Sequence, residues 1–131
     1  MEKTAFIVDD DESYRQYITT FLSHFKYNVK GYGNGKDCLA NLSLDPSFII
    51  LDHNLENDED GLELLRLIKT QKPSIPIIYL SGQQNVTKAV QALKLGSMEY
   101  IEKNGGTLIQ LKSIVEQFEG KKKKGIAGWF A

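Results

Sequence analysis

The chain has 131 residues, a length typical of a single domain. Its apolar fraction of 41% and charged fraction of 25% are those of a chain that folds around a core, which excludes an intrinsically disordered protein. The net charge is −1, and the last twelve residues hold four lysines and no acid. Removing those four charges leaves −5 for residues 1–119, so nucleic acid phosphates are poor partners for this chain.

Cysteine content and hydropathy indicate the cellular location of the protein. A single cysteine, Cys38, excludes an intrachain disulfide and fits a cytoplasmic location. The apolar runs are shorter than the roughly 18 residues of a membrane-spanning helix, and no signal-peptide pattern begins the chain. We expect a folded domain over 1–119 and a basic, apolar tail over 120–131. The tail fits a solvated terminus better than an adhesive segment, and it is too short for stable membrane anchoring.

Short apolar runs of strand length alternate with segments of helical periodicity. In chain order, the runs that predict strands are 5–8, 27–32, 48–51, 77–80 and 98–102. The segments that predict helices, each following one of these strands, are 14–25, 36–43, 62–68, 86–93 and 108–118. Asp11 or Ser13 caps the first helix, and Gly96 ends the fourth. Five strand–helix units predict an α/β fold with a parallel sheet covered on both faces, because several strands are apolar throughout.

Polar side chains follow four of the predicted strands where each strand ends. Asp9 and Asp10 follow the first strand, Asp52 the third, Ser81 the fourth and Lys103 the fifth. Because ligands of open α/β sheets bind outside the carboxyl ends of the strands, we expect these side chains to converge on one cleft.

The chemistry of this set indicates phosphoryl transfer onto an aspartate. Clustered carboxylates repel one another, and a hard cation such as Mg²⁺, or Mn²⁺ in its place, removes that repulsion. An aspartate can act as a nucleophile and become an acyl phosphate. An ammonium group and a hydroxyl group can hold the remaining phosphoryl oxygens.

Over residues 4 to about 119, the sequence resembles the receiver domain of two-component response regulators. The resemblance lies in five motifs that occur in order, each at the end of a predicted element. They are Val8-Asp9-Asp10-Asp11-Glu12, Leu51-Asp52, Asp60-Gly61, Leu80-Ser81-Gly82, and Tyr100 with Lys103. The resemblance implies a flavodoxin-like (βα)5 fold, a doubly wound parallel five-stranded sheet with strand order 2-1-3-4-5.

The resemblance also implies roles for the residues at the strand ends. Asp52 would be the phosphoacceptor. The Mg²⁺ ligands would be Asp10 directly, Asp9 mostly through water, Asp52, and the backbone carbonyl of Asn54. Lys103 would pair with Asp52 or with its phosphoryl group.

Other positions are implied to control the switch and its lifetime. Ser81 would bond the phosphoryl group and move toward it, and Tyr100 would rotate inward in the active state. The variable positions that tune the lifetime of the acyl phosphate would be Asn54 and Gln83.

Two positions depart from the family pattern. Glu56 stands where the family usually has proline, and the loop between Asp52 and Asp60 is one residue longer. Asn104 follows Lys103 in place of a proline that is usually in a cis bond. Because a cis bond before a non-proline residue costs about 2.5–4 kcal/mol, we expect a trans bond here.

The implied function is that of a phosphoacceptor rather than a turnover enzyme. The phosphoryl donor would be a phosphohistidine on a histidine kinase or a histidine phosphotransfer protein. The output would be a changed protein-binding surface near the fourth helix, fifth strand and fifth helix. No output domain is recognisable, so the effector is expected on another chain if residue 131 is the natural end.

Two other readings stay open: a receiver-like interaction module that does not switch, and a phosphohydrolase that uses Asp52 as its nucleophile. The downstream partner and homodimerisation also stay open. His53, next to the phosphoacceptor, is expected to be a solvated loop side chain, because a lone histidine without a second ligand seldom forms a site.

Overall fold

A computed structural model describes residues 3–55, 60–82 and 86–124 of the chain, the last five of them as backbone only. Five parallel strands form one sheet in the order β2-β1-β3-β4-β5. The strands are β1 (Lys3–Val8), β2 (Tyr27–Tyr32), β3 (Phe48–Asp52), β4 (Ile77–Ser81) and β5 (Glu99–Glu102). This is the flavodoxin-like (βα)5 topology that the resemblance implied, so the predicted fold and strand order are confirmed.

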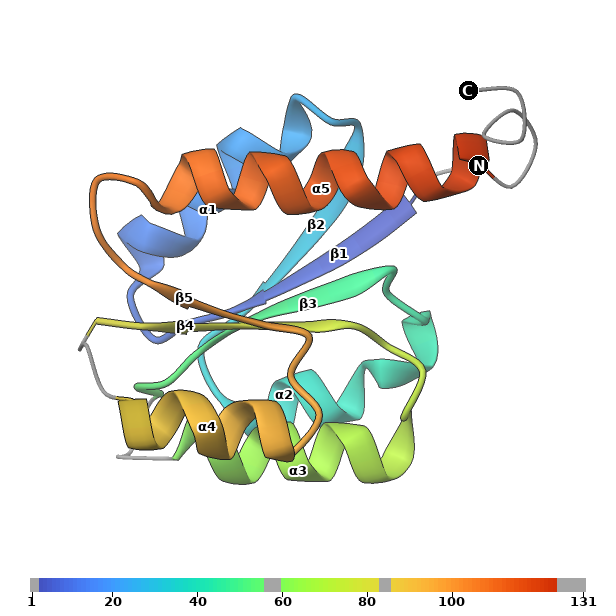
Figure 1. Ribbon diagram of the computed structural model, residues 1–131. Helices are drawn as coiled ribbons and strands as arrows, with labels where there is room; N and C mark the ends of the chain where they lie inside the picture. The colour runs from blue at the N-terminus through green and yellow to red at the C-terminus, as the bar shows by residue number, and fades with distance from the viewer. Residues whose placement is uncertain (1–2, 56–59, 83–85, 125–131) are drawn as a thin grey trace.

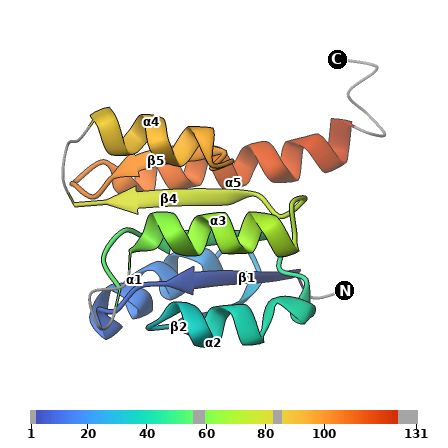
Figure 2. The same ribbon diagram turned by 90° about the horizontal axis from the view of Figure 1, so that it is seen from below.

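Helices cover both faces of the sheet. They are α1 (Glu12–Ser23), α2 (Gly35–Ala40), α3 (Gly61–Gln71), α4 (Val86–Lys94) and α5 (Thr107–Lys124), with a short 3-10 turn η1 (Leu42–Leu44) after α2. Helices α1 and α5 lie on one face, and α2, α3 and α4 lie on the other (Figures 1 and 2). The sheet therefore separates two hydrophobic clusters, one under each helical layer.

The central strands are apolar because both of their faces are covered. Every residue of β3 and of β4 is buried, whereas β2 and β5, at the two edges, include exposed residues. A strand buried on both faces cannot alternate apolar with polar side chains. The continuous apolar runs of the sequence are thus explained by the position of the strands in the sheet.

Helix termini follow local capping chemistry. The Asp11 side chain accepts a hydrogen bond from the Tyr14 backbone N–H at 3.2 Å, so Asp11 rather than Ser13 is the N-cap of α1. Asn34 caps α2 and Asp60 caps α3 in the same way. Gly96 follows α4 with φ of +107°, a conformation that favours glycine, and ends the helix as the sequence predicted.

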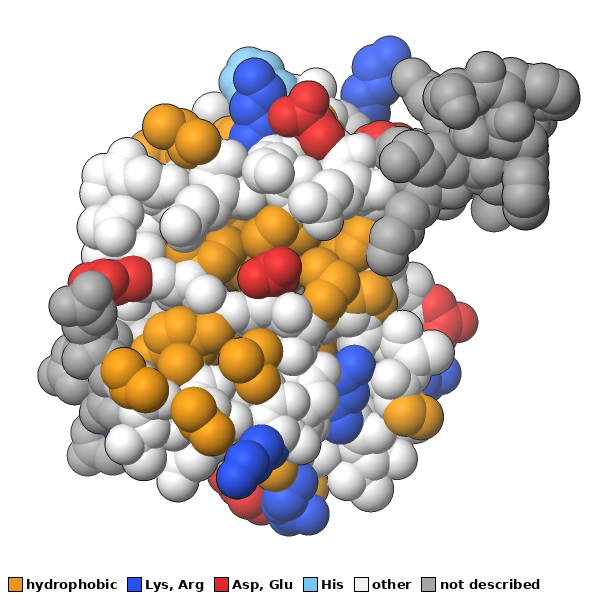
Figure 3. Space-filling model, in the orientation of Figure 1, with side chains coloured by type: hydrophobic (Ala, Val, Ile, Leu, Met, Phe, Trp, Pro, Cys, Tyr) orange, Lys and Arg blue, Asp and Glu red, His pale blue; other side chains and the backbone are white. Residues whose placement is uncertain are grey.

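Three of the apolar side chains whose spacing indicated helix α4 are exposed rather than packed in the core. Val86, Val90 and Leu93 are 79%, 43% and 49% exposed, and Ala92 is the buried residue of this helix. Figure 3 shows hydrophobic side chains gathered over α4 and between α4 and α5 on this face of the molecule. Helix α4 therefore contributes little to the core and presents an apolar surface.

Helix α5 is longer than the apolar spacing predicted. It continues through Lys124, past the expected boundary at residue 119 between domain and tail. Residues 125–131, with Trp129 and Phe130, lie outside the described part of the chain. Among the described residues, no helix has both the length and the hydropathy needed to cross a bilayer.

Candidate functional site

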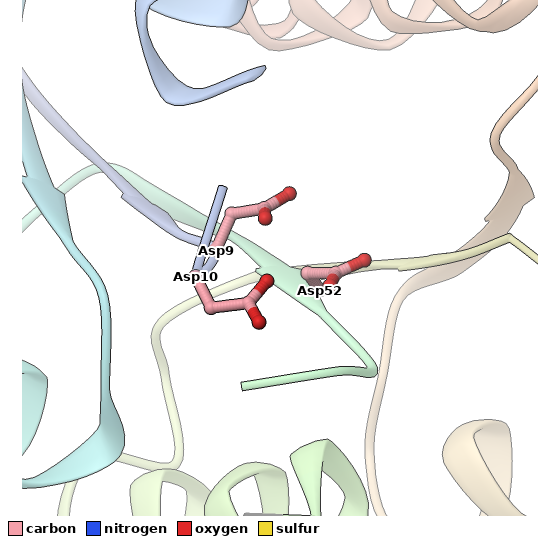
Figure 4. Close-up of side chains that lie close together, drawn as sticks. All are labelled: Asp9, Asp10 and Asp52. Atoms are coloured by element: carbon pink, nitrogen blue, oxygen red, sulfur yellow. The ribbon is translucent and has the colours of Figure 1, made fainter. Parts of the chain in front are cut away.

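Three carboxylates meet at the carboxyl edge of the sheet. Asp9 and Asp10 follow β1, and Asp52 is the last residue of β3, the neighbouring strand. One carboxylate oxygen from each lies within 4.8 Å of the others, and the three groups face one region (Figure 4). Asp9 and Asp52 are buried whereas Asp10 is exposed, so the cluster opens to solvent on the side of Asp10.

Lys103 joins this cluster from the far edge of the sheet. It follows β5, and its backbone N–H donates to the Ser81 carbonyl at 2.8 Å, which holds it beside the end of β4. Its Nζ lies 2.8 Å from Asp9 Oδ2 and 2.9 Å from Asp52 Oδ1. The predicted convergence of these three residues on one site is present in the structure.

The charges in the site are not balanced. Burial raises the pKa of Asp52 and of Asp9, and the Lys103 ammonium counters this in both cases. Burial lowers the pKa of Lys103, but its bonds with Asp52 and Asp9 outweigh burial and leave the pKa raised. Three carboxylates against one ammonium leave an excess of negative charge, and carboxylate oxygens are what Mg²⁺ prefers. The donor set therefore fits a divalent cation of that type.

Backbone N–H groups hold two of the carboxylates in place. The Asp11 N–H donates to Asp9 Oδ1 at 2.9 Å, and the Asn54 N–H donates to Asp52 Oδ2 at 3.0 Å. Each bond spans two residues, so the turn that leaves the strand also fixes its carboxylate. Asn54 is exposed beside Asp52, and Gln83 lies outside the described residues.

The two residues expected to switch occupy neighbouring strands. Ser81 ends β4 and is buried. Tyr100 in β5 pairs with Tyr79 in β4, and their rings stack with centroids 5.7 Å apart. Tyr100 is partly buried in this arrangement.

Gly61 allows helix α3 to start directly against the site. A Cβ at this position would lie 2.7 Å from the Asp52 carbonyl oxygen, 2.9 Å from His53 Cα and 2.9 Å from the Tyr79 hydroxyl. The Gly61 N–H also donates to the His53 carbonyl at 3.0 Å. Two of these neighbours are backbone atoms, so a larger residue cannot be accommodated by side-chain movement alone.

The interpretation of His53 as a solvated side chain is wrong. Its Nδ1 forms a hydrogen bond with the hydroxyl of the buried Tyr79, and its Nε2 lies 2.5 Å from Lys88 Nζ of α4. Burial and the nearby Lys88 charge lower the pKa of His53, which favours the neutral ring whose Nε2 can accept a hydrogen bond from the Lys88 ammonium. One signal could have found this pair: Tyr79 places a hydroxyl in an otherwise apolar strand, and a buried hydroxyl requires a partner.

The loop after Lys103 has the trans geometry that the sequence predicted. No peptide bond in the described residues is cis. The Asn104 N–H donates to Thr107 Oγ1 at 2.8 Å, and the Asn104 side chain accepts from the Gly106 N–H at 2.7 Å. The turn is thus held by side-chain hydrogen bonds in place of a proline ring. Glu56, the other departure, lies outside the described residues.

Comparison with known proteins identifies the family of this chain. The profile of the response regulator receiver domain matches residues 5–116. This chain belongs to that family. A Rickettsia felis protein described as an NtrX-like response regulator is 40% identical to this receiver domain over 117 residues, covering 86% of this chain and 25% of its own. Transcriptional regulatory protein CssR from Bacillus subtilis is 31% identical, covering 79% of this chain and 45% of its own.

Solved structures agree with the fold. The receiver domain of NtrX from Brucella abortus is 30% identical with a TM-score of 0.74, over 83% of this chain and 94% of that one. A CheY-like receiver domain protein from Methanospirillum hungatei has a TM-score of 0.82 at 24% identity, over 95% of this chain and 99% of that one. This receiver domain spans about a quarter of the length of its NtrX-like curated relatives.

Proposed function

We propose that this receiver domain accepts a phosphoryl group on Asp52 from a phosphohistidine of a histidine kinase or histidine phosphotransfer protein. The observation that supports the proposal most directly is the position of the Asp52 carboxylate. It is buried at the end of a central strand, between two further carboxylates and the Lys103 ammonium. The domain over 1–119 would carry this activity, with 120–131 as a tail.

In the proposed reaction, a carboxylate oxygen of Asp52 attacks the phosphorus atom. A P–O bond forms, the P–N bond of the phosphohistidine breaks, and its electron pair stays on the imidazole nitrogen. Bound Mg²⁺, or Mn²⁺, would neutralise charge on the phosphoryl oxygens, held by Asp9, Asp10, Asp52 and the backbone carbonyl of Asn54.

Lys103 has a separate task in this reaction. Its ammonium lies 2.9 Å from Asp52 Oδ1, so a small movement takes it to a phosphoryl oxygen on the same carboxylate. Ser81, at the end of the next strand, would offer its hydroxyl to another phosphoryl oxygen. Asn54 and Gln83 would tune how long the acyl phosphate lasts by controlling the approach of water.

The output would be a changed protein-binding surface over α4, β5 and α5. Tyr100 is only partly buried and stacks on Tyr79, two residues before Ser81, so a movement of Ser81 can reach Tyr100 through adjacent side chains. The exposed apolar positions of α4 lie on the same face (Figure 3). Burying such a surface against a protein partner is favourable.

Intact mass after treatment with a small phosphodonor and Mg²⁺ tests the proposal. We expect one phosphoryl adduct on the wild type and none on Asp52→Asn. Asp45→Asn is the matched control and should still be modified, because Asp45 is exposed, pairs with Lys72 and precedes β3, the strand that ends at Asp52. The proposal fails if the wild type takes no phosphate, or if the adduct survives Asp52→Asn.

The alternative, an interaction module that does not switch, rested on two departures from the family pattern. One concerned the residue after Lys103, yet the Lys103 ammonium reaches both Asp9 and Asp52 without a proline. A calorimetric titration with Mg²⁺ separates the two functions, because a module that has lost switching does not require the cation.

A further inference from the structure

The peptide bond after Lys103 does not explain how the lysine side chain is directed to the site. Its side chain must cross from β5 to the carboxylates of β1 and β3 on a flexible four-carbon stem. The following Asn104 is in a trans bond, and the turn is fixed by Thr107 and Gly106. These contacts fix the backbone of the turn, but they do not direct the lysine side chain.

Tyr14 of α1 contacts the lysine side chain directly. The Lys103 Nζ lies 4.1 Å from the centroid of the Tyr14 ring, well within the roughly 6 Å of a cation–π interaction. Burial raises the pKa of the Tyr14 hydroxyl and the Lys103 ammonium counters this, as expected for a ring that packs beside the charge. Tyr14, on α1, therefore contacts the ammonium group of a residue that follows β5.

We propose that Tyr14 is the positioning residue for Lys103, holding its ammonium against Asp9 and Asp52 so that it can transfer to the phosphoryl group. This inference rests on the proposed phosphoacceptor function. It assigns to an aromatic ring the task of directing the lysine side chain.

An aromatic ring suits this task for a physical reason. The ammonium has three donors, and the carboxylates of Asp9 and Asp52 engage it at 2.8 and 2.9 Å. The ring attracts the cation through its quadrupole and offers no directional acceptor. The ammonium can thus turn from Asp52 Oδ1 toward a phosphoryl oxygen without leaving the ring. A third carboxylate in the place of Tyr14 would compete for the donors.

Variants of Tyr14 separate the ring from the hydroxyl. Tyr14→Phe keeps the ring and loses only the hydroxyl. Tyr14→Leu keeps apolar volume and loses the ring, and Tyr14→Met takes its place should Tyr14→Leu not fold. Tyr32→Leu is the matched control, because Tyr32 packs on Phe6 under the opposite helical layer. Urea unfolding verifies that each variant is folded.

The first measurement is the rate of phosphate incorporation from a small phosphodonor with Mg²⁺, at several donor concentrations. Tyr14→Leu is expected to lower the rate at saturating donor about fivefold, the size of a partly buried cation–π contact. The donor concentration for half-maximal rate should stay unchanged, because the acidic cluster remains intact. Tyr14→Phe and Tyr32→Leu should stay within about twofold of the wild type.

The second measurement is the NMR order parameter of the Lys103 ammonium nitrogen, which needs no phosphorylation. It should fall in Tyr14→Leu and be retained in Tyr14→Phe. The inference is overturned if Tyr14→Leu matches the wild type in rate and order, or if Tyr14→Phe loses as much as Tyr14→Leu. A wild type that takes no phosphate while the ammonium order follows this pattern overturns the proposed function and leaves the positioning role.

Discussion

Some residues of this receiver domain are constrained by close packing although they take no part in the charged site. Gly61 lies outside the cluster of charges, yet it decides how near helix α3 comes to the end of β3. Cys38, in α2, is buried in the hydrophobic core and lies outside the cluster of charges. Each of these positions gives a test that does not depend on phosphorylation.

Gly61→Ala is expected to lower the free energy of unfolding by about 1–3 kcal/mol, because the added methyl group overlaps the backbone of Asp52 and His53. Urea unfolding measures the change. Gly105→Ala is the matched control, since a Cβ there meets no atom within 4 Å, and it should differ from the wild type by less than about 0.5 kcal/mol. Equal stability of the two variants would contradict the steric interpretation.

The buried thiol of Cys38 predicts a pH dependence. Burial raises its pKa to about 12, whereas an unfolded thiol titrates near roughly 8.5. The stability that the protonated thiol contributes is therefore complete below about pH 8.5 and is lost as the pH rises toward 12.

Cys38→Ala should be less stable than the wild type at pH 7, because it leaves a small cavity in the core. The difference should narrow by up to about 1.4 kcal/mol per pH unit between roughly pH 9 and pH 11. Urea unfolding of both proteins across this range measures it. A difference that does not change with pH would show that the thiol does not titrate as predicted.

At the scale of elements, the helices on one face of the sheet differ in how firmly they are packed. Helix α3 buries Leu64, Leu65 and Ile68, whereas α4 buries Ala92. Helix α4 is also held by the contact of Lys88 with His53 at the end of β3. An element with few buried apolar side chains moves at low cost in free energy, which suits α4 for the proposed output surface.

The contrast between these helices can be measured with one substitution in each. Leu65→Ala in α3 should lower the free energy of unfolding by about 2–5 kcal/mol, because the side chain is fully buried. Leu93→Ala in α4 removes the same atoms from a half-exposed position and should cost less than about 1.5 kcal/mol. Comparable losses in urea unfolding would mean that α4 is packed as firmly as α3.

At the scale of the whole molecule, the proposed cation binding would be linked to folding, because the three carboxylates come together only when β1 and β3 pair. Mg²⁺ should therefore raise the stability of the wild type, by about 2.7 kcal/mol at a concentration one hundred times its dissociation constant. Asp10→Asn should lose this effect while remaining folded, because Asp10 is exposed. Thermal unfolding with and without Mg²⁺ measures both, and a similar Mg²⁺ effect in Asp10→Asn would contradict the assignment of the cation to this cluster.

Much of the fold and of the site could be predicted because the signals are local. Continuous apolar runs predicted the buried strands β3 and β4, and Asp9, Asp52 and Lys103 were found from their places at strand ends. The spacing of Val86, Val90 and Leu93 predicted a helix correctly. The spacing could not show that these side chains are exposed, because periodicity identifies the apolar face of a helix but not what packs against that face.

The amino-acid sequence by itself determined the strand order, through the family pattern, and the residues that meet at the carboxyl edge of the sheet. The positions of the site residues follow from short-range patterns and from the rule that parallel strands end together, whereas the strand order was implied by the resemblance. Only the tertiary structure decided which groups surround them: the Tyr14 ring over Lys103, His53 between Tyr79 and Lys88, and the narrow space at Gly61. These contacts join residues far apart in the chain, and distances between such residues are fixed by packing, which no local pattern records.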